Sequence, residues 1–211
     1  MFQNMPDPQT MLMMAIAFLT ALTVHEYAHA RAALAEGDDT AKVAGRISLN
    51  PLDHLDPFGA IMFVLMMMNG FGIAWGKPVP VNPYRFRSPR WGNLRVSLWG
   101  PLSNILFACA LALLFRFIVA GRFGLNYVPL ILTCISMNLV LAMFNLLPVP
   151  PLDGSKVLAS LLPYETARRY EEAMGKYGFL ILIGLLLTGV ISIILGPPRR
   201  FLFGLLTGIP F

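Results

Sequence analysis

Charged residues and cysteines are both scarce in this chain. Only 13% of its 211 residues are charged and 56% are hydrophobic, whereas soluble domains carry about 25% charged residues. This composition excludes an ordinary soluble domain. A bilayer-crossing helix needs ~18 apolar residues, and four runs approach or exceed that length: 11–35, 96–120, 127–147 and 179–195. We therefore expect an all-α polytopic membrane protein with about four full spans.

Other absences narrow the class further. Residues 1–10 contain no Lys or Arg, so the first apolar run lacks the basic segment of a signal peptide. Cys109 and Cys134 both fall within expected spans and indicate no disulfide framework. We see no repeat and no separate soluble segment, and so expect a single membrane-embedded domain over 1–211. The net charge of +5 lies in loops between spans, which the positive-inside rule explains without a nucleic-acid partner. No feature of the sequence fixes an oligomeric state.

The apolar run 58–75 contains "NGFG" and can either cross the bilayer or enter and return on one side. Re-entry would place most Lys and Arg residues of the loops on one side and the N-terminus on the other, whereas a crossing gives a weaker bias. We therefore favour a re-entrant segment. The basic side is then cytoplasmic, in what we expect to be the plasma membrane of a prokaryote. The following "GKPVPVNPYRF" predicts a short β-hairpin-like loop near the active site.

The first apolar run carries three costly polar residues in "HEYAH", which are His25, Glu26 and His29. In an H-E-x-x-H pattern on a helix, both imidazoles share one face and can bind one metal ion, and the glutamate can act as a base. The alternative is a hydrogen-bonded cluster between helices. A carboxylate near mid-membrane costs ~2.5–3.5 kcal/mol, which favours the metal site over a purely structural cluster.

A hydrolytic zinc site usually has three protein ligands and one open position. Two candidates remain for the third ligand: His54, between Asp53 and Asp56, and Asp153 in "FNLLPVPPLDG". The re-entrant topology brings Asp153 to the same side as His29, so Asp153 and that topology are mutually consistent. A crossing segment would place Asp153 at the wrong face.

Three ordered motifs carry a family resemblance: "HEYAH", "GPLSN" (100–104) and "NLLPVPPLDG" (145–154). They resemble the site-2 protease family of intramembrane zinc metalloproteases. "GRISLNPLDHLDPFG" and "GKPVPVNPYRF" further resemble its compact subgroup, without PDZ or nucleotide-sensing domains. The resemblance implies one zinc ion held by His25, His29 and Asp153, and Glu26 as catalytic base. It also implies cleavage of substrate helices within the lipid bilayer, as in regulated intramembrane proteolysis.

Further residues have two interpretations each. Asn145 either stabilises the oxyanion of the reaction or caps its own helix, and Asn104 either bonds a carbonyl at a helix kink or supports the site. His54 is better explained as a structural loop residue than as a site residue. Val79, Val81 and Asn82 either bind the extended substrate or belong to a loop that plugs the site.

The alternative function is a membrane transporter or metal-binding protein that uses the same polar cluster. A transporter would favour repeated halves with polar residues along a pathway, and this sequence shows no repeat.

Overall fold

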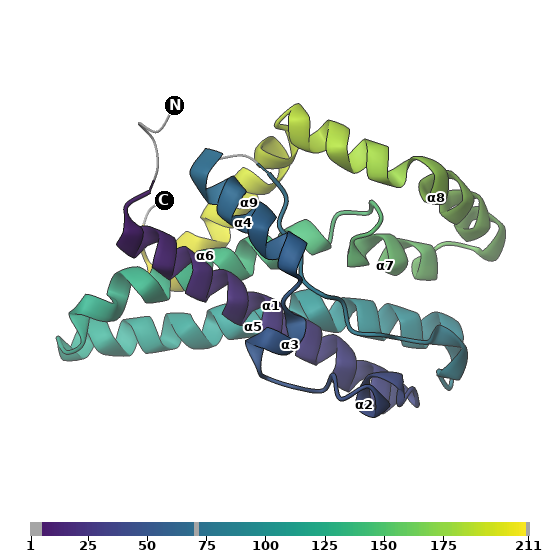
Figure 1. The fold of residues 1–211 in the computed structure, drawn as a ribbon, viewed down its shortest axis with the longest axis horizontal. Helices are drawn as coiled ribbons and strands as arrows, with labels where there is room; N and C mark the ends of the chain where they lie inside the picture. The colour runs from purple at the N-terminus through teal and green to yellow at the C-terminus, as the bar shows by residue number, and fades with distance from the viewer. Residues whose placement is uncertain (1–5, 70–71, 210–211) are drawn as a thin grey trace.

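The computed structural model describes residues 6–69 and 72–209, and within them every regular element is helical (Figure 1). Two short 3₁₀ turns, η1 (Pro83–Arg85) and η2 (Leu125–Tyr127), accompany the α-helices. The α-helices are α1 (Pro8–Glu36), α2 (Thr40–Val43), α3 (Pro51–His54), α4 (Pro57–Asn69), α5 (Pro89–Gly121), α6 (Val128–Asn145), α7 (Asp153–Leu161), α8 (Tyr164–Leu187) and α9 (Val190–Thr207).

Among the described residues, four helical segments are long and apolar enough to cross a membrane, which confirms the expected number of spans. They are Pro8–Glu36, Pro89–Gly121, Leu125–Asn145 and Val190–Thr207. The expected fourth span, 179–195, is wrong in position. That apolar run is divided between α8 and α9 at Gly189, whose φ of 71° lies in the left-handed region that favours glycine. Apolar composition continues across this break, so hydropathy alone did not show it.

Helices α1, α5 and α6 pack against one another and form the centre of the molecule (Figure 1). Phe115 of α5, Ile135 and Leu139 of α6 and Phe203 of α9 belong to one buried apolar cluster. A second cluster joins α1 to α4, where the rings of Phe18 and Phe63 stack with centroids 4.3 Å apart. The central helices are therefore fixed on two sides, by α9 and by α4.

Local sequence sets both ends of α1. The Asp7 carboxylate accepts hydrogen bonds from the backbone N–H groups of Gln9 and Thr10, and Pro8 occupies the first helical turn. Gly37 ends the helix at φ 106°, and its backbone N–H bonds the last turn. The long α1 therefore presents residues 25–29 in its C-terminal half.

The chain that enters α4 and the chain that follows residues 70 and 71 lie side by side. The backbone N–H of Lys77 donates to the carbonyl of His54 (2.8 Å), and the Trp75 indole donates to Asp56 (3.1 Å). With 13 residues, α4 is about 20 Å long, too short for a hydrocarbon core of about 30 Å. Residues 70 and 71 of the expected re-entrant turn lie outside the described residues.

The expected β-hairpin is wrong: the described residues 72–82 form no strand. Pro78 and Pro80 have no N–H to donate to a ladder. The backbone N–H groups of Lys77, Val79 and Asn82 bond to His54, Glu26 and Asp38. The segment is thus an extended strap that is tied to α1 and to the loops after it rather than paired with a strand.

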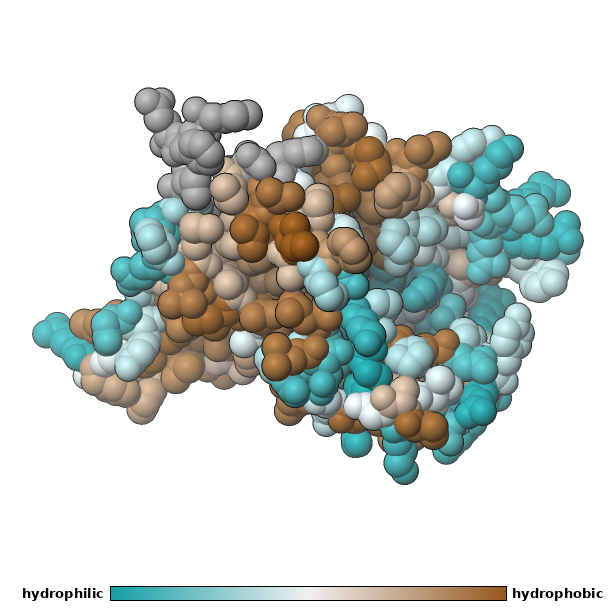
Figure 2. All heavy atoms as spheres, viewed as in Figure 1, coloured by the Kyte–Doolittle hydropathy of each residue, from teal (hydrophilic) through white to brown (hydrophobic). Residues whose placement is uncertain are grey.

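The surface divides along the long axis of the molecule. Figure 2 shows apolar side chains over the central part of this face, around α1 and α4. Hydrophilic residues gather where Figure 1 places α2 and the first half of α8. This distribution matches a protein with an apolar middle in the bilayer and one large polar end in water.

Candidate metal centre and active site

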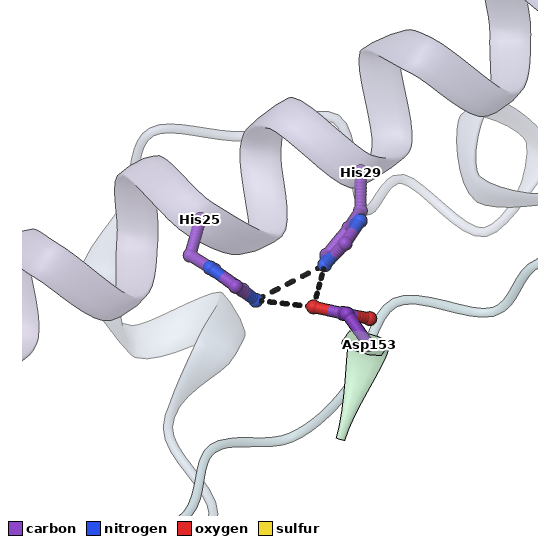
Figure 3. A group of neighbouring side chains, drawn as sticks. All are labelled: His25, His29 and Asp153. Atoms are coloured by element: carbon purple, nitrogen blue, oxygen red, sulfur yellow. Dashed lines mark hydrogen bonds and ion pairs between the residues drawn. The ribbon is translucent and has the colours of Figure 1, made fainter. Parts of the chain in front are cut away.

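His25 and His29 lie one turn apart on α1 and point from the same helix face (Figure 3). Both are buried, with exposed fractions of 4% and 8%, and their Nε2 atoms are 3.0 Å apart. The i, i+4 spacing accounts for this arrangement, since residues four apart are neighbours on a helix. The two imidazoles therefore offer two nitrogen ligands to a single point.

Asp153 approaches the same point from the first residue of α7 (Figure 3). Its Oδ2 lies 3.1 Å from Nε2 of His25 and 3.0 Å from Nε2 of His29. The next residue, Gly154, permits the close turn, because a Cβ there would lie 2.2 Å from the carbonyl oxygen of Leu146. The non-helical chain between α6 and α7 thus folds tightly enough to return Asp153 to α1.

Outer hydrogen bonds hold both imidazoles. Nδ1 of His29 lies 2.8 Å from the Val96 carbonyl, and Nδ1 of His25 lies 2.8 Å from Oδ1 of Asn104. Both partners belong to α5, which approaches closely because residue 100 is glycine. A Cβ on Gly100 would lie 2.3 Å from Nε2 of His29. Helix α5 therefore orients the two rings by bonding their Nδ1 atoms, while their Nε2 atoms face Asp153.

The donor set fits a metal cation. The Val96 carbonyl can only accept, so Nδ1 of neutral His29 carries the proton and Nε2 carries a lone pair. That lone pair faces the Asp153 carboxylate at 3.0 Å, where two acceptors repel unless a cation lies beside them. Two imidazole nitrogens and one carboxylate oxygen form a ligand set that zinc takes in catalytic sites. The three ligand atoms lie within 4.8 Å of one another.

Glu26 lies beside this group and does not belong to it. Its carboxylate is buried, with 8% of the residue exposed, and Oε2 accepts the backbone N–H of Val79 at 2.8 Å. Both His25 and Glu26 line an apolar cavity of about 730 Å³ between α1, α6, α8 and residues 72–78. A carboxylate at the wall of such a cavity can exchange a proton with a molecule bound inside it.

The other predicted residues are placed as follows. Asn145 also lines the cavity, but its amide donates to the carbonyl of Leu141 within α6 (3.0 Å). His54 is fully buried, donates from Nε2 to the Ser48 carbonyl (2.8 Å) and is not in the metal-binding group. Val81 packs with the apolar clusters beside α1, and the Asn82 side chain caps η1. The structure therefore brings Asn145 to the cavity wall and ties His54 into its own loop.

Three residues with clear roles were missed in the sequence. Asn138 of α6 bonds Asn104 (2.9 Å), and its position inside an apolar run was an available signal. Asp38 is fully buried and accepts the N–H groups of Asn82 and Thr40, but "DDT" after a helix looks like an ordinary loop. Gly100 gave no signal beyond its place in "GPLSN", because close approach of another helix is a tertiary property.

Comparisons with known proteins agree with this geometry. The model of peptidase family M50 matches residues 121–188. The chain is 38% identical over 192 residues to "Putative zinc metalloprotease YwhC" of Bacillus subtilis (strain 168), covering 87% of this chain and 84% of that protein.

Two further relatives have similar names. "Putative zinc metalloprotease Rip2" of Mycolicibacterium smegmatis is 27% identical over 86% of this chain and 69% of its own length. "Zinc metalloprotease MJ0392" of Methanocaldococcus jannaschii is 31% identical over 50% of this chain and 32% of its own. No solved structure gives a significant match. The extent of the YwhC match, together with the helix-borne H-E-x-x-H and the apolar helices, shows that the chain belongs to peptidase family M50 and is a membrane-embedded zinc metallopeptidase of the site-2 protease type.

Proposed function

We propose that the chain is an intramembrane endopeptidase that binds one zinc ion through His25, His29 and Asp153 and cleaves membrane-spanning segments of other proteins. The single observation that carries this proposal is the convergence of these three buried side chains beside Glu26, at the wall of an apolar cavity. Burial of so many polar groups among apolar helices is costly unless they are used together.

Zinc in such a site lowers the pKa of a bound water and polarises the carbonyl to be attacked. Glu26 is the base of the proposal. It takes the proton from the attacking water and passes it to the leaving amine, and the adjacent cavity holds the substrate within its reach. In the structure Glu26 accepts the N–H of Val79, so the carboxylate is held toward the strap, residues 72–82, before substrate arrives.

Asn145 is proposed to donate its amide to the carbonyl oxygen as negative charge develops there. Its position at the cavity wall supports this role, and its bond to Leu141 uses only one of the two amide hydrogens. Asn104 supports the site from behind through His25. We assign His54 to the loop that it closes with Ser48.

The substrate is proposed to be a membrane helix that unwinds locally at the cavity. The apolar cavity walls suit side chains that come from the bilayer, and a peptide bond must be extended before it can be attacked. The extended strap with Val79, Val81 and Asn82 lies beside Glu26. The N–H groups of Val79 and Asn82 already bond to Glu26 and Asp38, so pairing with such a chain is proposed to use the carbonyl groups of the strap.

The proposed location is the plasma membrane of a prokaryote, with the active site toward the cytoplasm. Basic residues are abundant in residues 77–95 and in the first half of α8, and the positive-inside rule assigns such segments to the cytoplasm. In this arrangement α4 belongs to the re-entrant segment, because His54 before it and Lys77 after it are joined by a backbone hydrogen bond.

The test is co-expression of the full chain with a library of single-span membrane proteins, and comparison with Glu26→Gln. We expect this variant to keep zinc and to lose cleavage by roughly 10²–10⁴-fold, because a base is removed while the ligands stay. Glu165→Gln is the matched control, since Glu165 is an exposed carboxylate at the start of α8. Cleavage by Glu26→Gln within a few-fold of wild type would end the assignment of the base.

Elemental analysis of the same purified proteins tests the ligands. We expect about one zinc per chain in wild type and a clear loss in His29→Ala and Asp153→Ala. Full zinc in Asp153→Ala, together with loss in His54→Ala, would move the third ligand to the loop before α4.

A further inference from the structure

Two asparagines lie fully buried among the membrane-crossing helices behind the metal centre. Asn104 of α5 and Asn138 of α6 are both 0% exposed, and their side chains bond to each other at 2.9 Å. A polar side chain among apolar helices is costly unless each donor and acceptor is satisfied. The hydrogen bonds of this pair determine which way each amide faces.

The orientation of the Asn138 side-chain amide is fixed by the backbone of its own helix. The amide nitrogen of Asn138 donates to the backbone carbonyl of Cys134 (2.9 Å). A backbone carbonyl has no hydrogen to give, so the amide end must face it. The oxygen end of Asn138 then faces Asn104 and can only accept there.

The orientation of the Asn104 side-chain amide is fixed in turn by Asn138 and by α1. Its amide nitrogen donates one hydrogen to Asn138 and the other to the carbonyl of Ala21 in α1 (2.9 Å). Both N–H groups are used, and the oxygen is left facing Nδ1 of His25 at 2.8 Å. Because that oxygen is only an acceptor, Nδ1 of His25 must carry the proton. Nε2 of neutral His25 then keeps its lone pair, which points toward Asp153.

We propose that Asn138 and Asn104 are positioning residues that fix the tautomer of His25, so that Nε2 is always available as a metal ligand. The proposal rests on the ligand role of His25 in the proposed function. His29 reaches the same tautomer directly, through the backbone carbonyl of Val96. His25 has a side-chain partner instead, and an amide can flip. Asn138 prevents the flip of Asn104, although it does not itself contact His25 and acts through two successive hydrogen bonds.

The loss of Asn138 has a defined consequence. Without its acceptor, Asn104 is held in one orientation only by the carbonyl of Ala21. A flipped Asn104 would present its amide nitrogen to His25, and the proton of His25 would then move to Nε2 and block ligation. Outer partners of metal ligands typically contribute 10–100-fold in metal affinity. We expect Asn138→Leu to weaken zinc binding by about 10-fold and Asn104→Leu by more.

The first measurement is zinc affinity of the full chain in detergent by competition with a chelator. Asn138→Asp should stay within a few-fold of wild type, because a buried neutral carboxyl can donate to Cys134 and accept from Asn104. The matched control is Thr23→Val. Thr23 is buried on the same helix as His25, and within the described part of the chain its hydroxyl bonds to the Leu19 carbonyl of that helix alone. Equal zinc affinity in Asn138→Leu and Thr23→Val would overturn the proposal.

The second measurement reads the tautomer itself. The chain has three histidines, so nitrogen-15 spectra of histidine-labelled protein can resolve each ring at pH 8, before and after zinc is added. We expect wild-type His25 to carry its proton on Nδ1 and Asn138→Leu to show a mixture. His54 is an internal reference for the opposite tautomer. Its Nε2 donates to the Ser48 carbonyl, while its buried Nδ1 has no hydrogen-bond partner among the described residues.

The spectra separate two kinds of failure. If zinc shifts the Nε2 resonance of neither His25 nor His29, the ligand assignment itself is wrong. If zinc shifts both, but wild-type His25 carries its proton on Nε2 before zinc is added, only the asparagine relay is wrong. This second result needs no variant, so the proposal remains testable even if Asn138→Leu does not fold.

Discussion

Gly100→Ala provides a sharp test of how closely α5 approaches the metal centre. The added Cβ would lie 2.3 Å from Nε2 and 2.5 Å from Cε1 of His29, and 2.7 Å from Cε1 of His25. Real Cβ atoms essentially never make contacts under 3.0 Å. The imidazole of His29 or the backbone of α5 must therefore move by about 0.7 Å, the difference between 2.3 and 3.0 Å.

Such a movement exceeds what a zinc ligand tolerates, since ligand distances in real sites lie within about 0.2 Å of their usual values. His29 cannot turn away freely, because its Nδ1 is bonded to Val96 of the same α5 at 2.8 Å. We expect zinc affinity to fall by at least about tenfold, equivalent to ~1.4 kcal/mol, and cleavage to fall with it. The assay is chelator competition on purified protein, with helix content by circular dichroism as the check on folding.

Gly184→Ala is the control for adding a methyl group to a helix. Gly184 lies within α8, and a Cβ there meets nothing within 4 Å. Replacing a helical glycine by alanine in open space should stabilise by roughly 0.5–1 kcal/mol, so this variant should bind zinc normally and melt no lower than wild type. If Gly100→Ala bound zinc as tightly as Gly184→Ala, the close approach of α5 to the histidines would be refuted.

Two further predictions concern the strap and the membrane topology. Burial raises the pKa of Asp38, but hydrogen bonds from Asn82 and Thr40 outweigh it and hold that pKa below its usual value. Its stabilisation should therefore be present above about pH 4 and fade as pH falls further. Asp38→Asn should cost about 1–3 kcal/mol at neutral pH, and its difference from wild type in thermal unfolding should shrink in acid; a constant difference from pH 3 to 7 would contradict this. For topology, Val43→Cys and Tyr84→Cys are introduced singly in a chain whose Cys109 and Cys134 are changed to Ala. Both positions are exposed, and one precedes α4 in the sequence while the other follows it. Both should react with a membrane-impermeant thiol reagent only after cells are opened, and labelling of one alone in intact cells would show that α4 crosses.

The shared helix face of His25 and His29 could be predicted from the sequence, because it depends on local geometry alone. The i, i+4 spacing of His25 and His29 fixes a shared face on any helix. Asp153 was harder to place. It reaches the histidines only because residues 146–152 fold back tightly, with Gly154 against the carbonyl of Leu146, and no local pattern encodes that path. Residue patterns left His54 open as an alternative, and the family resemblance indicated Asp153.

The two errors in the fold have a common physical origin. Alternating valines in "KPVPV" and continuous apolar residues over 179–195 are both local patterns. In the structure, the backbone of the valine segment bonds to Glu26, Asp38 and the carbonyl of His54 instead of to a strand. The apolar run 179–195 is interrupted at Gly189, which has a positive φ. Hydropathy describes which residues leave water, but it does not describe which partners the backbone finds or where a helix turns.

Buried polar residues in an apolar chain are the most informative part of such a sequence, because each one needs a partner that justifies its cost. His25, Glu26 and His29 were found in this way, and Asn138 could have been, since it interrupts an apolar run with no charge or turn nearby. Its partner is Asn104, whose partner is His25. A polar residue deep in a predicted span should therefore be considered together with the other polar residues at the same depth on neighbouring helices. Gly100 marks the limit of that approach: its function lies in the side chain that it lacks, and only the distance from α5 to His29 reveals it.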